Sequence, residues 1–181
     1  MHRIILVCLL ALLLSPAAKN QSAQTEPAQK ILQEAVKNAQ SSDKTVFLIF
    51  HASWCSWCKR LDAALSDPEV NKIMDANYVI THLDVLESKD KKDLENAGGD
   101  TIMKDLGGEK SGLPYYAFLD AKGKKIADSN VMPKNQNIGY PGSEEEIIEF
   151  EKLLRQTALR MTDDQRNQVV AYFRKNAPKP R

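Results

Sequence analysis

Two cysteines separated by two residues, Cys55 and Cys58, are the side chains of this sequence best suited to chemistry. They lie in the stretch HASWCSWCKR, and the third cysteine, Cys8, lies close to the N-terminus. A close cysteine pair can bind a metal ion, close a structural disulfide or exchange electrons with another disulfide. The neighbouring residues and the elements that carry the pair decide between these functions.

A metal site and a structural disulfide are both disfavoured. Structural zinc takes four Cys or His ligands, and the chain lacks a second cysteine pair. His51 and His82 are too few and too scattered in the sequence to replace it, so we predict no metal. Closing a loop across two residues removes little entropy from the unfolded chain, which argues against a purely structural disulfide. Redox chemistry is therefore the favoured interpretation.

The sequence around the pair predicts a buried strand that leads into a helix. TVFLIF (45–50) is a continuous apolar run, and WCSWCKRLDAAL (54–65) has helical character without Gly or Pro. Cys55 is thus expected at a helix N-terminus, where free backbone N–H groups and the helix dipole stabilise an anion. A thiolate in that position has its pKa lowered from about 8.5 to between about 3.5 and 7.5. Cys58, one turn later, is suited to attack a mixed disulfide.

The side chains that flank the pair suggest further roles. Trp54 and Trp57 can shield the sulfur atoms and offer apolar surface to a peptide, although simple packing would leave the same pattern. Lys59 adds positive charge, for which a solvated helix position is the alternative explanation. Protonated His51 could stabilise the Cys55 thiolate, with a packing role as the alternative.

The first 18 residues differ from the rest of the chain. MHRIILVCLLALLLSPAA combines a basic start, a short apolar run and a small-residue exit, as in a secretory signal peptide. A retained membrane anchor is the alternative. Cleavage near Ala18 removes Arg3 and Cys8, and the net charge changes from +1 to zero (+1 minus 1). We expect an exported protein, periplasmic or secreted and not membrane-bound after cleavage, in a compartment that oxidises close thiols.

Composition restricts the partners. The 25 basic and 24 acidic residues leave no excess of positive charge, so we expect no nucleic-acid partner. The sequence implies no dissociable cofactor. Asp84 and Glu87 are possible proton carriers near the pair, but surface carboxylates are the commoner explanation of such residues.

The remaining patterns predict one α/β domain over 26–176, preceded by a polar, disordered lead (19–25) and followed by a frayed tail (177–181). Two capping boxes, Ser143 with Glu146 and Thr162 with Gln165, predict the two final helices. The other expected elements are helices over 26–40 and 68–77, a second buried strand over 78–85, short helices within 87–108 and a hairpin over 115–130. This order predicts a mixed sheet with a parallel core and an antiparallel edge.

The stretch FHASWCSWCK resembles the active-site segment of thioredoxin-like proteins, in which an aromatic strand end leads into Trp-Cys-x-x-Cys-Lys. SDPEV and GLPYYAFLDAKGK are similar to segments of the secreted thioredoxin-like domains of bacterial thiol–disulfide interchange reductases. The resemblance covers about residues 26–160, and residues 162–176 look like an added helix. It implies a thioredoxin fold: a central mixed β-sheet flanked by helices, with an extra C-terminal helix.

The resemblance also implies roles for particular residues. Cys55 matches the nucleophile, Cys58 the resolving cysteine and Pro114 the cis-proline beside the disulfide, while Leu113 offers backbone groups to a peptide. The implied protein is an exported thiol–disulfide oxidoreductase that acts on protein disulfides or dithiols and takes electrons from an unidentified donor protein. Two alternatives stay open: a thioredoxin-fold module that binds a client or delivers Cu(I) without turnover, and a domain whose pair is vestigial.

Two departures from the family pattern affect the mechanism. Many thioredoxins carry a buried acid six residues before the first cysteine, where this chain has Ile49. The proton acceptor for Cys58 is therefore unassigned. Ser56 and Trp57 replace the Gly-Pro of many reductases, so the sequence does not distinguish a reductase from an oxidase or an isomerase.

Overall fold

A computed structural model of the chain describes residues 25–179. The expected signal peptide (1–18), all but the last residue of the lead, and the last two residues of the tail lie outside the described residues. The strands are β1 (Thr45–His51), β2 (Tyr78–Asp84), β3 (Tyr115–Leu119) and β4 (Lys125–Asp128). The helices are α1 (Ala28–Ser42), α2 (Ser56–Leu65), α3 (Pro68–Asn77), η1 (Lys89–Leu94), α4 (Gly99–Asp105), η2 (Pro133–Asn135), α5 (Glu144–Thr157) and α6 (Asp163–Lys175).

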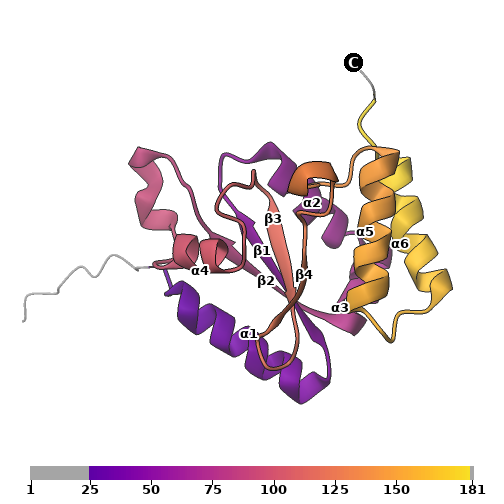
Figure 1. Cartoon of the computed structure of the whole chain (residues 1–181), viewed down its shortest axis with the longest axis horizontal. Helices are drawn as coiled ribbons and strands as arrows, with labels where there is room; N and C mark the ends of the chain where they lie inside the picture. Colours follow the sequence, from indigo (N-terminus) through magenta and orange to yellow (C-terminus); the bar gives the residue numbers. More distant parts are fainter. Residues whose placement is uncertain (1–24, 180–181) are drawn as a thin grey trace, which may run out of the picture.

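The four strands form one mixed sheet in the order β2-β1-β3-β4. β1 pairs parallel with β2 and antiparallel with β3, and β3 and β4 form the predicted hairpin. The chain therefore has the predicted thioredoxin fold, with helices on both faces of the sheet (Figure 1). One detail of the predicted sheet is wrong: antiparallel pairing includes the central pair β1–β3 and is not confined to an edge.

The strand predicted over 78–85 is also less buried than expected. Four consecutive residues of β2 are only partly buried, from Val79 to His82. β2 lies at the edge of the sheet and pairs only with β1, so its apolar sequence is not covered on both faces. This partial exposure leaves His82 within reach of solvent.

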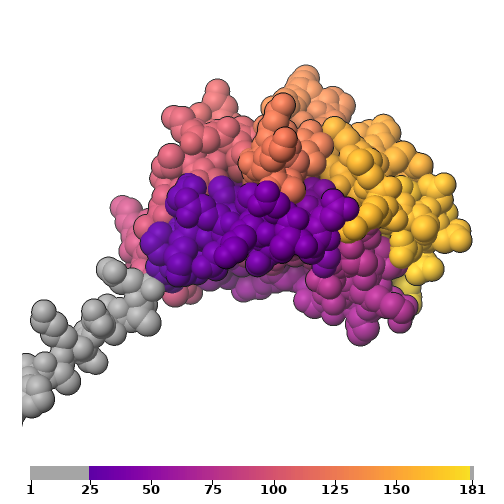
Figure 2. Space-filling model, turned by 90° about the horizontal axis from the view of Figure 1, so that it is seen from below, coloured from indigo at the N-terminus to yellow at the C-terminus, as the bar shows by residue number. Residues whose placement is uncertain are grey.

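β1 is the centre of the molecule and separates two apolar cores. Residues 46–50 are all fully buried. Because successive side chains of a strand point to opposite faces, Phe47 and Ile49 pack into the core under α2, α3, α5 and α6. Val46, Leu48 and Phe50 pack into the core under α1. α1 covers the middle of that side of the molecule, with the C-terminal helices at one end (Figure 2).

Local capping signals set the ends of several helices. The Asp67 side chain accepts hydrogen bonds from the N–H groups of Glu69 and Val70, and Pro68 occupies the first turn of α3. Both predicted capping boxes are present, at the starts of α5 and α6. None of the helices described between residues 25 and 179 has the length and hydropathy needed to cross a bilayer.

Candidate functional site

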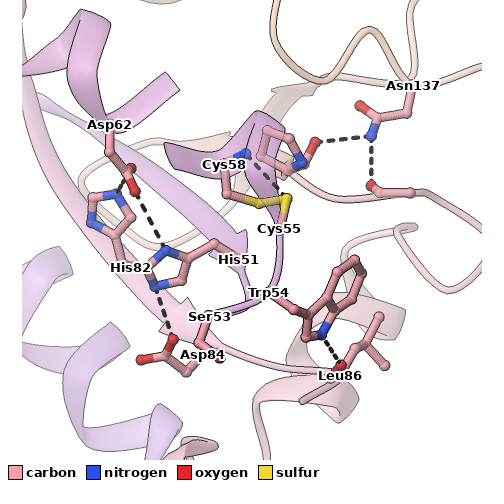
Figure 3. Close-up of a disulfide and its surroundings, with 12 residues drawn as sticks. His51, Ser53, Trp54, Cys55, Cys58, Asp62, His82, Asp84, Leu86 and Asn137 are labelled. Carbon is pink, nitrogen blue, oxygen red and sulfur yellow. Dashed lines mark hydrogen bonds and ion pairs between the residues drawn. A yellow bond between two sulfur atoms is a disulfide. The ribbon is translucent and has the colours of Figure 1, made fainter. Parts of the chain in front are cut away.

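A disulfide joins Cys55 and Cys58 where the sheet passes into α2 (Figure 3). β1, whose five central residues are fully buried, ends at His51; residues 52–54 turn the chain, and Cys55 is the N-cap of α2. The backbone N–H of Cys58 donates to Cys55 Sγ over 3.1 Å. A free helix N–H group thus points at the first sulfur, in the geometry that stabilises a thiolate once the bond is reduced.

The disulfide is buried, but its surroundings include exposed apolar side chains. Cys55 and Cys58 are 3% and 1% exposed and pack with Ala52 and Leu113. Trp54 and Trp57, by contrast, are 56% and 44% exposed. The Trp54 indole N–H donates to the Leu86 carbonyl oxygen over 2.8 Å, and Trp57 stacks on Tyr140. The two tryptophans therefore form a fixed apolar surface beside the disulfide.

The segment before β3 lies against the same disulfide. The Leu113–Pro114 peptide bond is cis, as the resemblance implies. Asn137 Nδ2 donates to the carbonyl oxygens of Gly112 and Pro114, at 2.7 and 2.9 Å, and so holds the residues on both sides of Leu113 (Figure 3). Among the described residues, no backbone hydrogen bond to Leu113 is formed. Its N–H and C=O are therefore available to an added strand.

Asn137 is a residue that the sequence analysis missed. It lies more than 20 residues after the segment that it holds. No local motif relates the two positions, and a single Asn in a polar loop gives no signal of its own.

A groove of about 1030 Å³ opens next to this segment. Trp57 and Leu113 lie on its wall, together with residues 109–112 and the loop from Lys134 to Tyr140. Four lysines and two glutamates also line it: Lys104, Lys110, Lys134, Lys179, Glu109 and Glu146. The groove thus begins beside the disulfide, at Trp57 and Leu113, and continues over a more polar, mainly basic surface.

Glu87 is not the surface carboxylate that the sequence suggested. It is 4% exposed, and its two oxygens accept hydrogen bonds from the backbone N–H and the hydroxyl of Ser53. Burial by itself would raise the pKa of Glu87, but the bonds from Ser53 hold that pKa below its ordinary value. The ionised carboxylate of Glu87 therefore stabilises the turn between β1 and Cys55 through these hydrogen bonds.

The two histidines, far apart in the sequence, lie together on the α2 side of the sheet. The ring centroids of His51 and His82 are 4.8 Å apart, and Asp62 of α2 contacts both rings. His51 also contacts Asp84. The prediction that these histidines are too scattered for a common site is therefore wrong, because the parallel pairing of β1 and β2 brings them together.

The ionisable groups of this cluster shift one another's pKa values. Burial by itself would lower the pKa of His51, but contacts with Asp62 and Asp84 raise it above its ordinary value. Burial alone would raise the pKa of Asp62, and the hydrogen bonds with His51 and His82 hold it well below its ordinary value. Both ring nitrogens of His51 face carboxylates rather than the sulfur atoms. The remaining candidate, Lys59, is exposed on α2.

Comparisons with known proteins agree with the fold and the pair. A sequence model of the thioredoxin-like family matches residues 27–121. The thiol:disulfide interchange protein DsbD of Photorhabdus laumondii is 33% identical over 93 residues, which are 51% of this chain and 14% of that protein. Protein disulfide isomerase-like 1-1 of Arabidopsis thaliana is 24% identical over 152 residues, 75% of this chain and 27% of that protein. The chain thus spans less than a third of either curated relative.

A solved structure extends the similarity to the C-terminal part of the chain. The crystal structure of a disulphide isomerase from Xylella fastidiosa superposes with a TM-score of 0.51 at 16% identity. The superposition covers 88% of this chain and 98% of that one. At this identity the likeness concerns the fold.

Proposed function

This chain belongs to the thioredoxin-like family, and we propose that it is an exported thiol–disulfide oxidoreductase that acts on protein clients through Cys55 and Cys58. The observation that carries the proposal is the position of Cys55 at the start of α2, with the Cys58 N–H directed at its sulfur. Export to the periplasm or beyond is proposed from the first 18 residues, and the similarity to a thiol:disulfide interchange protein supports it.

In the reducing direction the reaction begins with both cysteines as thiols. The Cys55 thiolate attacks one sulfur of a client disulfide, and the other client sulfur leaves as a thiolate. The Cys58 thiolate then attacks Cys55 Sγ, which forms the Cys55–Cys58 bond and releases the second client sulfur. Two electrons have passed from the pair to the client, and a dithiol donor protein restores the thiols by the same exchange in reverse. Starting from the disulfide, the steps run in reverse: a client thiolate attacks Cys55 Sγ and displaces the Cys58 thiolate, and the second client thiolate then attacks the client sulfur of the mixed disulfide and releases Cys55, so the client dithiol is oxidised.

Client binding is proposed to use the surface between Trp54 and the groove. The apolar faces of Trp54 and Trp57 contact the residues beside the client cysteine, while the free backbone groups of Leu113 pair with its main chain. Pro114 completes this edge next to the disulfide. The lysines that line the groove favour client segments that are neutral or acidic rather than basic.

Reduction of insulin disulfides tests the function. Cys55→Ser should lose all turnover because it removes the attacking thiolate, whereas Cys58→Ser should accumulate a mixed disulfide between Cys55 and the client. Non-reducing gel electrophoresis and mass spectrometry identify that species. Full turnover by the Cys55→Ser protein would refute the mechanism. Tight binding of Cu(I) by a wild-type protein that lacks turnover would support the metal-delivery alternative instead.

A further inference from the structure

The cluster around His51 is built from three elements that meet close to the disulfide. In the parallel register, Ile49 is opposite His82 and His51 is opposite Asp84. These four residues therefore share one face of the sheet, the face that α2 covers. Asp62 follows Cys58 by four residues on α2, which is about one helical turn. Two imidazoles and a carboxylate consequently converge from β1, β2 and α2.

The distances in this cluster are close to those of a metal site. His51 Nδ1 lies 3.7 Å from Asp62 Oδ2, and His82 Nε2 lies 3.0 Å from Asp62 Oδ1. One ligand atom from each of the three residues lies within 4.8 Å of the others. Around a tetrahedral Zn²⁺ with bonds of about 2.0–2.2 Å, neighbouring ligand atoms are about 3.4 Å apart. Small side-chain rotations are thus sufficient to place all three ligands around one ion.

The surroundings of the three residues also suit a metal ion. The second ring nitrogen of His51, Nε2, lies 3.2 Å from Asp84 Oδ1. A carboxylate that accepts the free N–H of a ligating histidine is the usual support of such a ligand, because it orients the ring and increases its basicity. The side chains of His51, His82 and Asp62 are 22%, 34% and 36% exposed, so solvent and ions can reach the site.

We propose that His51 Nδ1, His82 Nε2 and one Asp62 carboxylate oxygen bind a single divalent first-row transition-metal ion of the Zn²⁺ type. Two imidazoles and one carboxylate form a three-ligand set that leaves the fourth tetrahedral position to water. In this arrangement Asp84 is the supporting residue of His51. The site does not depend on the redox function, because the cysteines are bound to each other in the disulfide form and supply no ligand.

Metal titration of the oxidised protein, purified without a histidine tag, tests the proposal. We expect one Zn²⁺ per chain by calorimetry, and a rise of the melting temperature on binding. Co²⁺ should give the visible absorption of a four-coordinate site. In proton NMR spectra the imidazole signals of both His51 and His82 should shift on addition of one equivalent of Zn²⁺. This measurement uses the wild-type protein alone.

Substitutions then assign the ligands. His82→Ala and Asp62→Asn should each abolish the one-to-one binding and the rise in melting temperature. Asp84→Asn should weaken binding by about 10–100-fold, the usual effect of losing a supporting carboxylate. Asp75→Asn, which changes an exposed carboxylate on α3, is the matched control and should leave the affinity unchanged.

Two outcomes would overturn the proposal. One is the absence of saturable Zn²⁺ binding by the oxidised wild-type protein at micromolar concentrations. The other is a Zn²⁺ affinity in both His82→Ala and Asp62→Asn that equals the wild-type affinity, when both variants also have the wild-type circular dichroism spectrum. The NMR measurement covers the case in which a variant misfolds, because it uses the wild-type chain alone.

Discussion

At the scale of single residues, the environment of Cys55 explains how one sulfur of the pair can be the more reactive. The Cys58 N–H lies 3.1 Å from Cys55 Sγ, and the N-terminal end of α2 favours negative charge at that position. Ile49, where many relatives carry an acid, is fully buried and cannot accept a proton. The Cys55 thiolate is therefore stabilised by the helix N-terminus, and the proton acceptor for Cys58 is a different group from residue 49.

The first prediction concerns the alkylation of the reduced protein by iodoacetamide. Cys55 should react rapidly at pH values at which free cysteine, with a pKa of about 8.5, is still protonated. Cys58 should react much more slowly, because it lies inside the first turn of α2 and the helix N–H group that stabilises a thiolate is directed at Cys55. Mass spectrometry of the modified peptides across a pH series gives both rates. A Cys55 rate that follows the titration of free cysteine would contradict the proposed activation.

The second prediction concerns Glu87 and acid stability. The folded-state pKa of Glu87 is lowered from 4.5, so its carboxylate contributes stability that is present above that value and is lost as the pH falls below it. Glu87→Gln should therefore lower the free energy of unfolding by about 1–3 kcal/mol at neutral pH, since a buried bonded charge is replaced by a weaker acceptor.

Urea unfolding of both proteins at several pH values measures this effect. The difference between the two should shrink as the pH falls below 4.5, because the unfolded wild-type chain then binds a proton at Glu87 before the folded chain does. Glu69→Gln, at an exposed position on α3, provides the control. A difference that stays constant down to pH 3 would show that Glu87 does not act through its charge.

At the scale of elements, the loop that contains η2 positions the strand edge next to the disulfide. Asn137 bonds to the carbonyl oxygens of Gly112 and Pro114 and leaves the backbone of Leu113 free. Its side chain bonds to these carbonyl groups and not to the sulfur atoms, so it is a positioning residue for the proposed client-binding edge.

The third prediction is that Asn137→Ala raises KM for insulin by about tenfold, equivalent to about 1.4 kcal/mol, with a small change in kcat. Loss of the two hydrogen bonds lets the Leu113 segment move, but leaves Cys55 and α2 in place. The rate with a small disulfide, which does not need the edge, should be unchanged. Asn167→Ala, which changes an exposed asparagine on α6 outside the groove, should behave like the wild type. Equal losses with insulin and with the small disulfide would show that Asn137 acts on the cysteines instead.

At the scale of the whole molecule, α6 closes one of the two cores. Val169 and Phe173 are fully buried in the core that α6 shares with α5 and α3, and Phe173 packs against Tyr140 and Phe150. Tyr140 in turn stacks on Trp57 beside the disulfide. The added helix is thus connected to the candidate site by two aromatic contacts, from Phe173 to Tyr140 and from Tyr140 to Trp57.

The fourth prediction is that Phe173→Ala destabilises the protein by about 3–5 kcal/mol, through lost burial and the cavity that is left. Asn167→Ala, on the exposed side of the same helix, should change the stability by less than about 0.5 kcal/mol. Chemical denaturation monitored by tryptophan fluorescence measures both. A loss below 1 kcal/mol for Phe173→Ala would mean that α6 is not part of the cooperative unit.

The features that the sequence alone determined are those set by short-range interactions. The cysteine spacing, the N-cap position of Cys55, the strand over β1 and both capping boxes depend on residues within a few positions of each other. For that reason the helices, the strands and the redox-active pair could be predicted from local patterns, whereas the thioredoxin fold was implied by the resemblance of segments such as FHASWCSWCK to that family. Only the tertiary structure showed that β2 is an edge strand and that Glu87 is buried and hydrogen-bonded to Ser53. It also showed that Asn137 holds the Leu113 segment in place.

The same distinction explains the histidine cluster. His51, Asp62 and His82 come together only because β1 and β2 pair in parallel with a particular register and α2 covers that face. Spacing along the chain carries no information about such contacts, since strand order and register arise from the packing of both cores. The sequence was therefore sufficient for the chemistry of the cysteines, and the three-dimensional arrangement was required to identify a second site beside them.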